Sequence, residues 1–109
     1  MSLMDIKRDK YRKARGNYSR KLDLFCRVCG NKIAEYQKDG GGNLRRMYLD
    51  RIIFPKRLVN LHKKLLKKIT LLRCSKCKED LGTPYIYKKE KRKAFKLYQD
   101  AIIKKVSRF

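Results

Sequence analysis

The four cysteines of the chain form two Cys-x-x-Cys pairs, Cys26–Cys29 and Cys74–Cys77. Two residues between paired cysteines allow a tight turn to direct both thiolates at one ion, and two such turns complete a tetrahedron. The spacing therefore predicts one structural Zn²⁺ ion with four thiolate ligands: Cys26, Cys29, Cys74 and Cys77. An iron–sulfur cluster is the alternative occupant. Because four thiolates close the coordination shell of zinc, we expect no catalysis at the metal.

Other uses of paired cysteines fit this chain less well. Two disulfides would suit a small secreted domain, but residues 1–18 contain no apolar core of a signal peptide. A Cys-x-x-Cys redox pair needs no second copy. His62 is the only histidine and lies in a lysine-rich stretch, so we interpret it as a partly exposed residue rather than a ligand. Metal-bound cysteines predict a reducing compartment, and we expect an intracellular, cytoplasmic protein.

The composition predicts one small domain with an anionic partner. The chain has 109 residues, of which 42% are hydrophobic, and no apolar run approaches the length of a membrane span. There are 32 Lys and Arg against 10 Asp and Glu, which gives a formal net charge of +22. A chain of this charge repels itself and attracts polyanions, so nucleic acid is the first partner to consider. An anionic membrane surface is the weaker interpretation.

The elements that must position the cysteines can be read from periodicity. Residues 22–29 alternate apolar and polar side chains and predict a strand that leads into the first pair, with residues 33–37 as its partner. Residues 38–43 follow as a loop or wide turn, because Gly, Asn and Asp tolerate positive φ. Residues 44–54 predict a second main strand, which Pro55 ends.

Residues 55–72 carry the pattern of a basic amphipathic helix. Apolar residues recur every three or four positions, and Lys and Arg fill the other side. The helix could stop near Lys68, because residues 69–73 also suit a strand. Beyond the second pair, residues 81–87 predict a strand, and residues 88–105 predict either a returning hairpin, which we favour, or a helix.

These elements together predict an α+β fold. Residues 22–109 would form a small antiparallel β-sheet domain of the zinc-ribbon or β-tent type. The basic amphipathic helix would be inserted between the two zinc knuckles, the turns formed by residues 26–29 and 74–77. Residues 1–21 would form a basic N-terminal arm that is either disordered or ordered by its partner.

The cysteine pairs also support a resemblance. Two widely separated Cys-x-x-Cys pairs, with Leu81-Gly82 and the aromatic residues Tyr85 and Tyr87 after the second, resemble the Yippee-like group of β-tent zinc proteins. The resemblance implies that two zinc knuckles from distant hairpins meet over antiparallel sheets. It also implies that the four cysteines are the ligands. A generic zinc ribbon of the kind found in ribosomal and RNA-processing proteins is the alternative.

The sequence predicts a nucleic-acid-binding protein, with RNA preferred because tyrosines among Lys and Arg suit stacking on unpaired bases. Tyr48 is equally suited to the core, and Arg51 to pairing with Asp50. A zinc-stabilised interaction module for acidic protein partners is the alternative function. An enzyme is not expected, because carboxylates and the histidine form no pairing motif. The expected nucleic-acid contacts are Arg45, Arg46, Tyr48, Arg57, Lys63, Lys64, Lys67 and Lys68.

Overall fold

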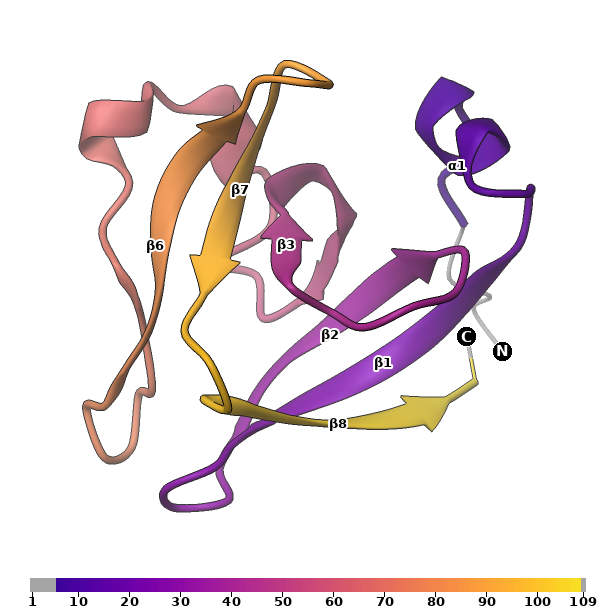
Figure 1. The fold of residues 1–109 in the computed structure, drawn as a ribbon. Helices are drawn as coiled ribbons and strands as arrows, with labels where there is room; N and C mark the ends of the chain where they lie inside the picture. The colour runs from indigo at the N-terminus through magenta and orange to yellow at the C-terminus, as the bar shows by residue number, and fades with distance from the viewer. Residues whose placement is uncertain (1–5, 109) are drawn as a thin grey trace.

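The computed structural model describes residues 6–108 and shows two four-stranded antiparallel sheets (Figure 1). In spatial order, sheet A contains β4 (Ile52–Phe54), β2 (Lys32–Asp39), β1 (Ser19–Cys26) and β8 (Ile102–Ser107). In the same way, sheet B contains β3 (Arg46–Tyr48), β7 (Arg92–Leu97), β6 (Asp80–Tyr87) and β5 (Leu72–Arg73). The predicted small antiparallel β domain is confirmed, but the α+β class is corrected to a β-rich domain with two sheets. The only α-helix of the described residues is the short α1 (Lys10–Ala14).

The hydrophobic core combines side chains of both sheets. In β1, Leu22, Leu24 and Cys26 are almost fully buried, as their alternation with polar residues predicts. β1 pairs with β2 from Ser19 to Phe25, which confirms residues 33–37 as part of the partner strand. Sheet B contributes buried residues such as Phe95 to the same cluster. The core therefore holds the two sheets together.

The segment that follows the second cysteine pair forms a hairpin. β6 pairs with β7 from Gly82, which lies opposite Leu97, to Tyr87, which lies opposite Arg92. Residues 88–91 make the turn between the two strands. Lys91 closes this turn with a φ of 53°. The chain then crosses to sheet A and ends in β8, which pairs with β1. The hairpin is confirmed, and the alternative helix over residues 88–105 is wrong.

The single strand predicted over residues 44–54 is wrong. The chain forms β3 in sheet B, turns through a 3-10 helix (Leu49–Arg51) and continues as β4 in sheet A. The neighbouring residues Arg51 and Ile52 are both buried, at 2% and 4% exposure, as are Tyr48 and Leu49, at 8% and 1%. A regular strand points adjacent side chains to opposite faces, whereas a chain that turns from one sheet to the other can bury both. This segment is thus a crossover between the sheets.

The amphipathic helix predicted over residues 55–72 is also wrong. The structure has turns, two 3-10 helices (Leu61–Lys63 and Leu66–Lys68) and β5 at the end of the segment. Asn60 takes a left-handed φ of 71°, which interrupts an α-helix. A continuous helix would also place Lys63 beside Lys67 and Lys64 beside Lys68, and no acid is near in sequence to offset the repulsion.

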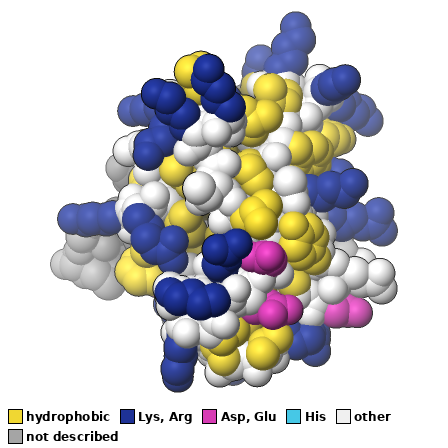
Figure 2. Space-filling model, turned by 90° about the vertical axis from the view of Figure 1, so that its left-hand side faces the viewer, with side chains coloured by type: hydrophobic (Ala, Val, Ile, Leu, Met, Phe, Trp, Pro, Cys, Tyr) yellow, Lys and Arg dark blue, Asp and Glu magenta, His cyan; other side chains and the backbone are white. Residues whose placement is uncertain are grey.

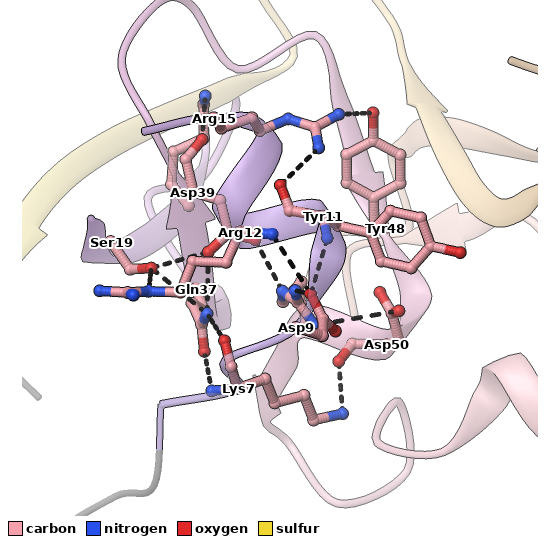
Figure 3. A network of polar contacts seen from close by, with 12 residues as sticks. Lys7, Asp9, Tyr11, Arg12, Arg15, Ser19, Gln37, Asp39, Tyr48 and Asp50 are labelled. Carbon is pink, nitrogen blue, oxygen red and sulfur yellow. Dashed lines mark hydrogen bonds and ion pairs between the residues drawn. The ribbon is translucent and has the colours of Figure 1, made fainter. Parts of the chain in front are cut away.

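The N-terminal residues from Lys7 onward pack against the domain (Figure 3). Asp9 caps α1 by accepting bonds from the backbone N–H groups of Tyr11 and Arg12, and it also binds Arg51 at 2.6 Å. Lys7 exchanges two backbone bonds with the Gln37 amide, each 2.9 Å long. β1 begins at Ser19, inside the predicted arm, so residues 6–21 are part of the folded structure.

Candidate metal centre and basic surface

The four cysteine sulfurs form one compact cluster. All four Sγ atoms lie within 4.8 Å of one another. The Cys26–Cys77 distance is 3.7 Å, and the Cys29–Cys74 distance is 3.5 Å. Zn–S bonds of about 2.3 Å in a tetrahedron require sulfurs about 3.8 Å apart. The cluster therefore has the donor set and the size for one zinc ion, and His62 is not part of it.

The two knuckles are built alike. Cys26 ends β1 and Cys74 follows β5, so each knuckle lies at the turn of an antiparallel hairpin, one in each sheet. The amide of Gly30 donates to the Cys26 carbonyl at 2.8 Å, and that of Lys78 donates to the Cys74 carbonyl at 3.0 Å. Gly30 and Lys78 both have positive φ, 77° and 67°. An ion here would connect sheet A to sheet B.

Backbone amides favour a thiolate at Cys74. Burial raises the pKa of its thiol, but bonds from the amides of Cys77 and Lys76 and from the neighbouring thiols lower it to about 6. Asn31 adds a side-chain N–H donor 3.8 Å from the same sulfur. Cys74 and Cys26 are buried, whereas Cys77 is exposed. Cys74 is thus prepared to lose its proton when a metal binds, and the cluster can be reached from solvent at Cys77.

Part of the predicted nucleic-acid surface surrounds a hollow beside the second knuckle, which we call the knuckle hollow. It has a volume of about 700 Å³, and Arg57, Lys64 and Lys68 lie at its edge with Cys74. Within residues 6–108, no Asp or Glu lines it. Figure 2 shows the side of the molecule where β6 lies: hydrophobic side chains gather in the middle, Lys and Arg lie around much of them, and Asp and Glu lie at the lower part of this face. Lys63 and Lys67 are exposed but do not line the hollow.

The other predicted contacts lie at a different place. Arg45 and Arg46 line a second cleft, between β3, β7 and β8, which we call the intersheet cleft. Tyr48 is only 8% exposed, and the Arg92 guanidinium carbon lies 3.7 Å from its ring centre. Its hydroxyl accepts a bond from Arg15 at 2.9 Å. The prediction of Tyr48 as a stacking residue is therefore corrected: it is a core residue.

The burial of two arginines, Arg51 and Arg92, was not predicted from the sequence. The side chain of Arg51 is 1% exposed, and its Nε bonds Asp39 at 2.8 Å. Burial opposes the charge of Arg51, but its bonds to Asp9 and Asp39 raise its pKa above the usual range. The side chain of Arg92 is 5% exposed and binds Asp50 at 2.7 Å. Arg51 also forms the predicted pair with Asp50, but at 3.9 Å this is the longest ion pair of Arg51.

The fold and the cysteines define the molecule as a small β-rich domain with two antiparallel sheets and a four-cysteine cluster at metal-binding distance. No protein-family model, no curated protein and no solved structure matches the chain. Within residues 6–108, none of the helices has the length and apolar character needed to cross a membrane.

Proposed function

We propose that the protein is a zinc-stabilised nucleic-acid-binding protein that prefers RNA and binds mainly through phosphate contacts. The observation that carries this proposal is the excess of exposed cations that no carboxylate neutralises. Most carboxylates are held in ion pairs, while many lysines and arginines face solvent without an ion-pair partner among residues 6–108. An excess of positive charge on the surface attracts a polyanion.

The acidic groups are largely neutralised within the molecule. The carboxylates that form ion pairs are Asp9, Asp23, Glu35, Asp39, Asp50, Asp80 and Glu90. Two of their partners, Arg51 and Arg92, are buried. By contrast, Lys63, Lys64 and Lys67 are exposed and have no ion-pair partner among residues 6–108. The cations that face solvent are thus free to contact phosphate.

In this proposal zinc has a structural role. Cys26, Cys29, Cys74 and Cys77 would hold one ion as thiolates, and the ion would supply a cross-link between the sheets rather than a reactive centre. No catalytic step is assigned to the protein, because four thiolates leave no position for substrate. One zinc knuckle on a hairpin of each sheet supports the β-tent resemblance over a zinc ribbon.

The proposal is tested by fluorescence anisotropy with a labelled oligouridine, the matching single-stranded DNA and polyglutamate across a salt series. RNA should bind at about 0.1 M salt, and its affinity should fall with a log–log slope of about −0.7 per phosphate contact. RNA should bind more tightly than polyglutamate at every salt concentration. Undetectable binding of both nucleic acids at about 0.1 M salt would contradict the proposal.

The knuckle hollow favours a second candidate, an interaction module for an acidic protein segment. Leu58, Leu61 and Ile69 line the hollow together with Lys64 and Lys68. A lining that combines apolar and basic side chains suits an amphipathic acidic helix better than a phosphate chain. Binding of an acidic amphipathic peptide, lost on Lys64→Glu with Lys68→Glu, together with no binding of RNA, would favour this candidate.

A further inference from the structure

The intersheet cleft exists because sheet B leaves β8 uncovered. Lys104 and Val106 of β8 pair with Leu24 and Leu22 of β1. Paired residues of an antiparallel ladder point to the same face, so all four side chains lie on the inner face of sheet A. Leu22 and Leu24 are buried there, but Val106 is 62% exposed. Figure 1 shows β8 along the edge of its sheet, away from β6. The inner face of β8 is therefore open.

The cleft that results is large and strongly basic. Its volume is about 920 Å³, and its lining includes Arg27, Arg45, Lys96 and Lys104. Among residues 6–108, none of these four cations has an ion-pair partner, and Asp100 is the one acid that lines the cleft. Cations that converge on one concave surface repel each other unless an anion lies between them. The cleft thus favours an anionic occupant.

Two tyrosines stand beside these cations with their hydroxyl groups already bonded. The Tyr98 hydroxyl lies 2.7 Å from the Thr83 hydroxyl, while Tyr98 as a residue stays 42% exposed. The Tyr85 hydroxyl accepts a bond from Arg46 at 2.9 Å. Rings held in place lose little entropy when a ligand stacks on them. Sequence reasoning singled out Tyr48 instead, which is buried.

We propose that the intersheet cleft binds single-stranded RNA, with phosphates near Arg45, Lys96 and Lys104 and an unpaired base stacked on Tyr98. This inference rests on the proposed function and assigns its site. Cations follow the backbone of a single strand, and an exposed tyrosine accepts a base face that a duplex keeps inside its stack. An acidic peptide would use the cations but has no base to place on the ring.

The test measures binding of a labelled oligouridine of about ten nucleotides by the intact, zinc-loaded chain. Tyr98→Ala should weaken binding about tenfold and leave the salt slope unchanged, because it removes stacking and no charge. Tyr98→Phe keeps the ring but loses the bond to Thr83 that holds it, so it should bind RNA more weakly than the wild type and more tightly than Tyr98→Ala. Lys96→Ala with Lys104→Ala should weaken binding and reduce the salt slope by about 0.7 per lost contact.

Matched controls separate the cleft from the rest of the surface. Tyr18 is 49% exposed and outside the cleft, so Tyr18→Ala should leave RNA binding unchanged. Polyglutamate binding should be insensitive to Tyr98→Ala. If RNA binds but Tyr98→Ala and the double lysine variant bind it like the wild type, the cleft is not the site and the proposed function stands. Equal weakening of RNA and polyglutamate by Tyr98→Ala also overturns the stacking proposal. If the wild-type protein itself binds no nucleic acid, the proposed function is refuted instead.

Discussion

The hydroxyl oxygen of Tyr36 accepts a hydrogen bond from the backbone N–H of Tyr48 at 2.8 Å. Tyr36 belongs to β2 in sheet A and Tyr48 to β3 in sheet B, so this bond joins the two sheets inside the core. The cysteine cluster joins the same two sheets at the hairpin turns. Two polar connections thus accompany the hydrophobic contact between the sheets.

Replacement of Tyr36 by Phe should cost about 1–3 kcal/mol of unfolding free energy, because the buried Tyr48 N–H loses its acceptor. The cost should shrink at high pH. Burial raises the pKa of Tyr36 in the folded state, although the Tyr48 N–H and Arg92 partly oppose this shift. The unfolded state therefore loses this proton first, and the wild type loses stability as pH rises above about 10.

Urea unfolding from pH 8 to about pH 11 checks this prediction. The difference between wild type and Tyr36→Phe should narrow by about 1 kcal/mol at the alkaline end. Tyr98→Phe serves as the control for loss of an exposed tyrosine hydroxyl. A difference that stays constant over this range would show that Tyr36 ionises equally in both states.

Replacement of Lys78 by glycine should stabilise the second knuckle. Lys78 has a left-handed φ of 67°, a conformation that costs a residue with a Cβ atom about 1–2 kcal/mol. Glycine adopts this conformation without strain, but its greater conformational entropy in the unfolded chain offsets part of the gain. Lys78→Gly should therefore raise the free energy of unfolding by about 0.5 kcal/mol. Gly30 occupies the equivalent position with open space around it, and Gly30→Ala should destabilise by about 1 kcal/mol. Thermal unfolding of the zinc-loaded proteins measures both changes in stability. If Lys78→Gly unfolds at a lower temperature than the wild type, the backbone of Lys78 is not strained.

The buried ion pair of Arg51 should matter far more than an exposed one. Asp39→Asn leaves the Arg51 charge poorly compensated in a buried site and should cost about 3 kcal/mol. Asp80→Asn breaks the exposed Arg73–Asp80 pair, whose side chains are 52% and 47% exposed, and should cost less than about 1 kcal/mol. Denaturant unfolding measures both, and equal costs would exclude a special role for Arg51.

Sequence alone could predict the elements whose signal is local. The alternation of Leu22, Leu24 and Cys26 reflects a strand with one buried face, and it gave the correct strand and partner. The predicted ligand cysteines lie together because each pair is brought to a turn by such a hairpin.

Other features depend on contacts between distant residues. The spacing of Leu58, Leu61 and Ile69 is helical, yet these side chains are buried by turns that pack on sheet B and need no helix. The role of Arg51 depends on Asp9 and Asp39, which are remote in the sequence. A basic N-terminal segment gives no sign that its Asp9 has such a partner.

The central claim is that one zinc ion, held by four thiolates, joins the two sheets. The most direct test is native mass spectrometry of the purified chain combined with circular dichroism before and after chelation. We expect one zinc ion per chain, loss of native structure when it is removed, and no zinc retained by Cys26→Ser. A chain that stays folded without metal, or a Cys26→Ser variant that binds zinc like the wild type, would contradict the claim.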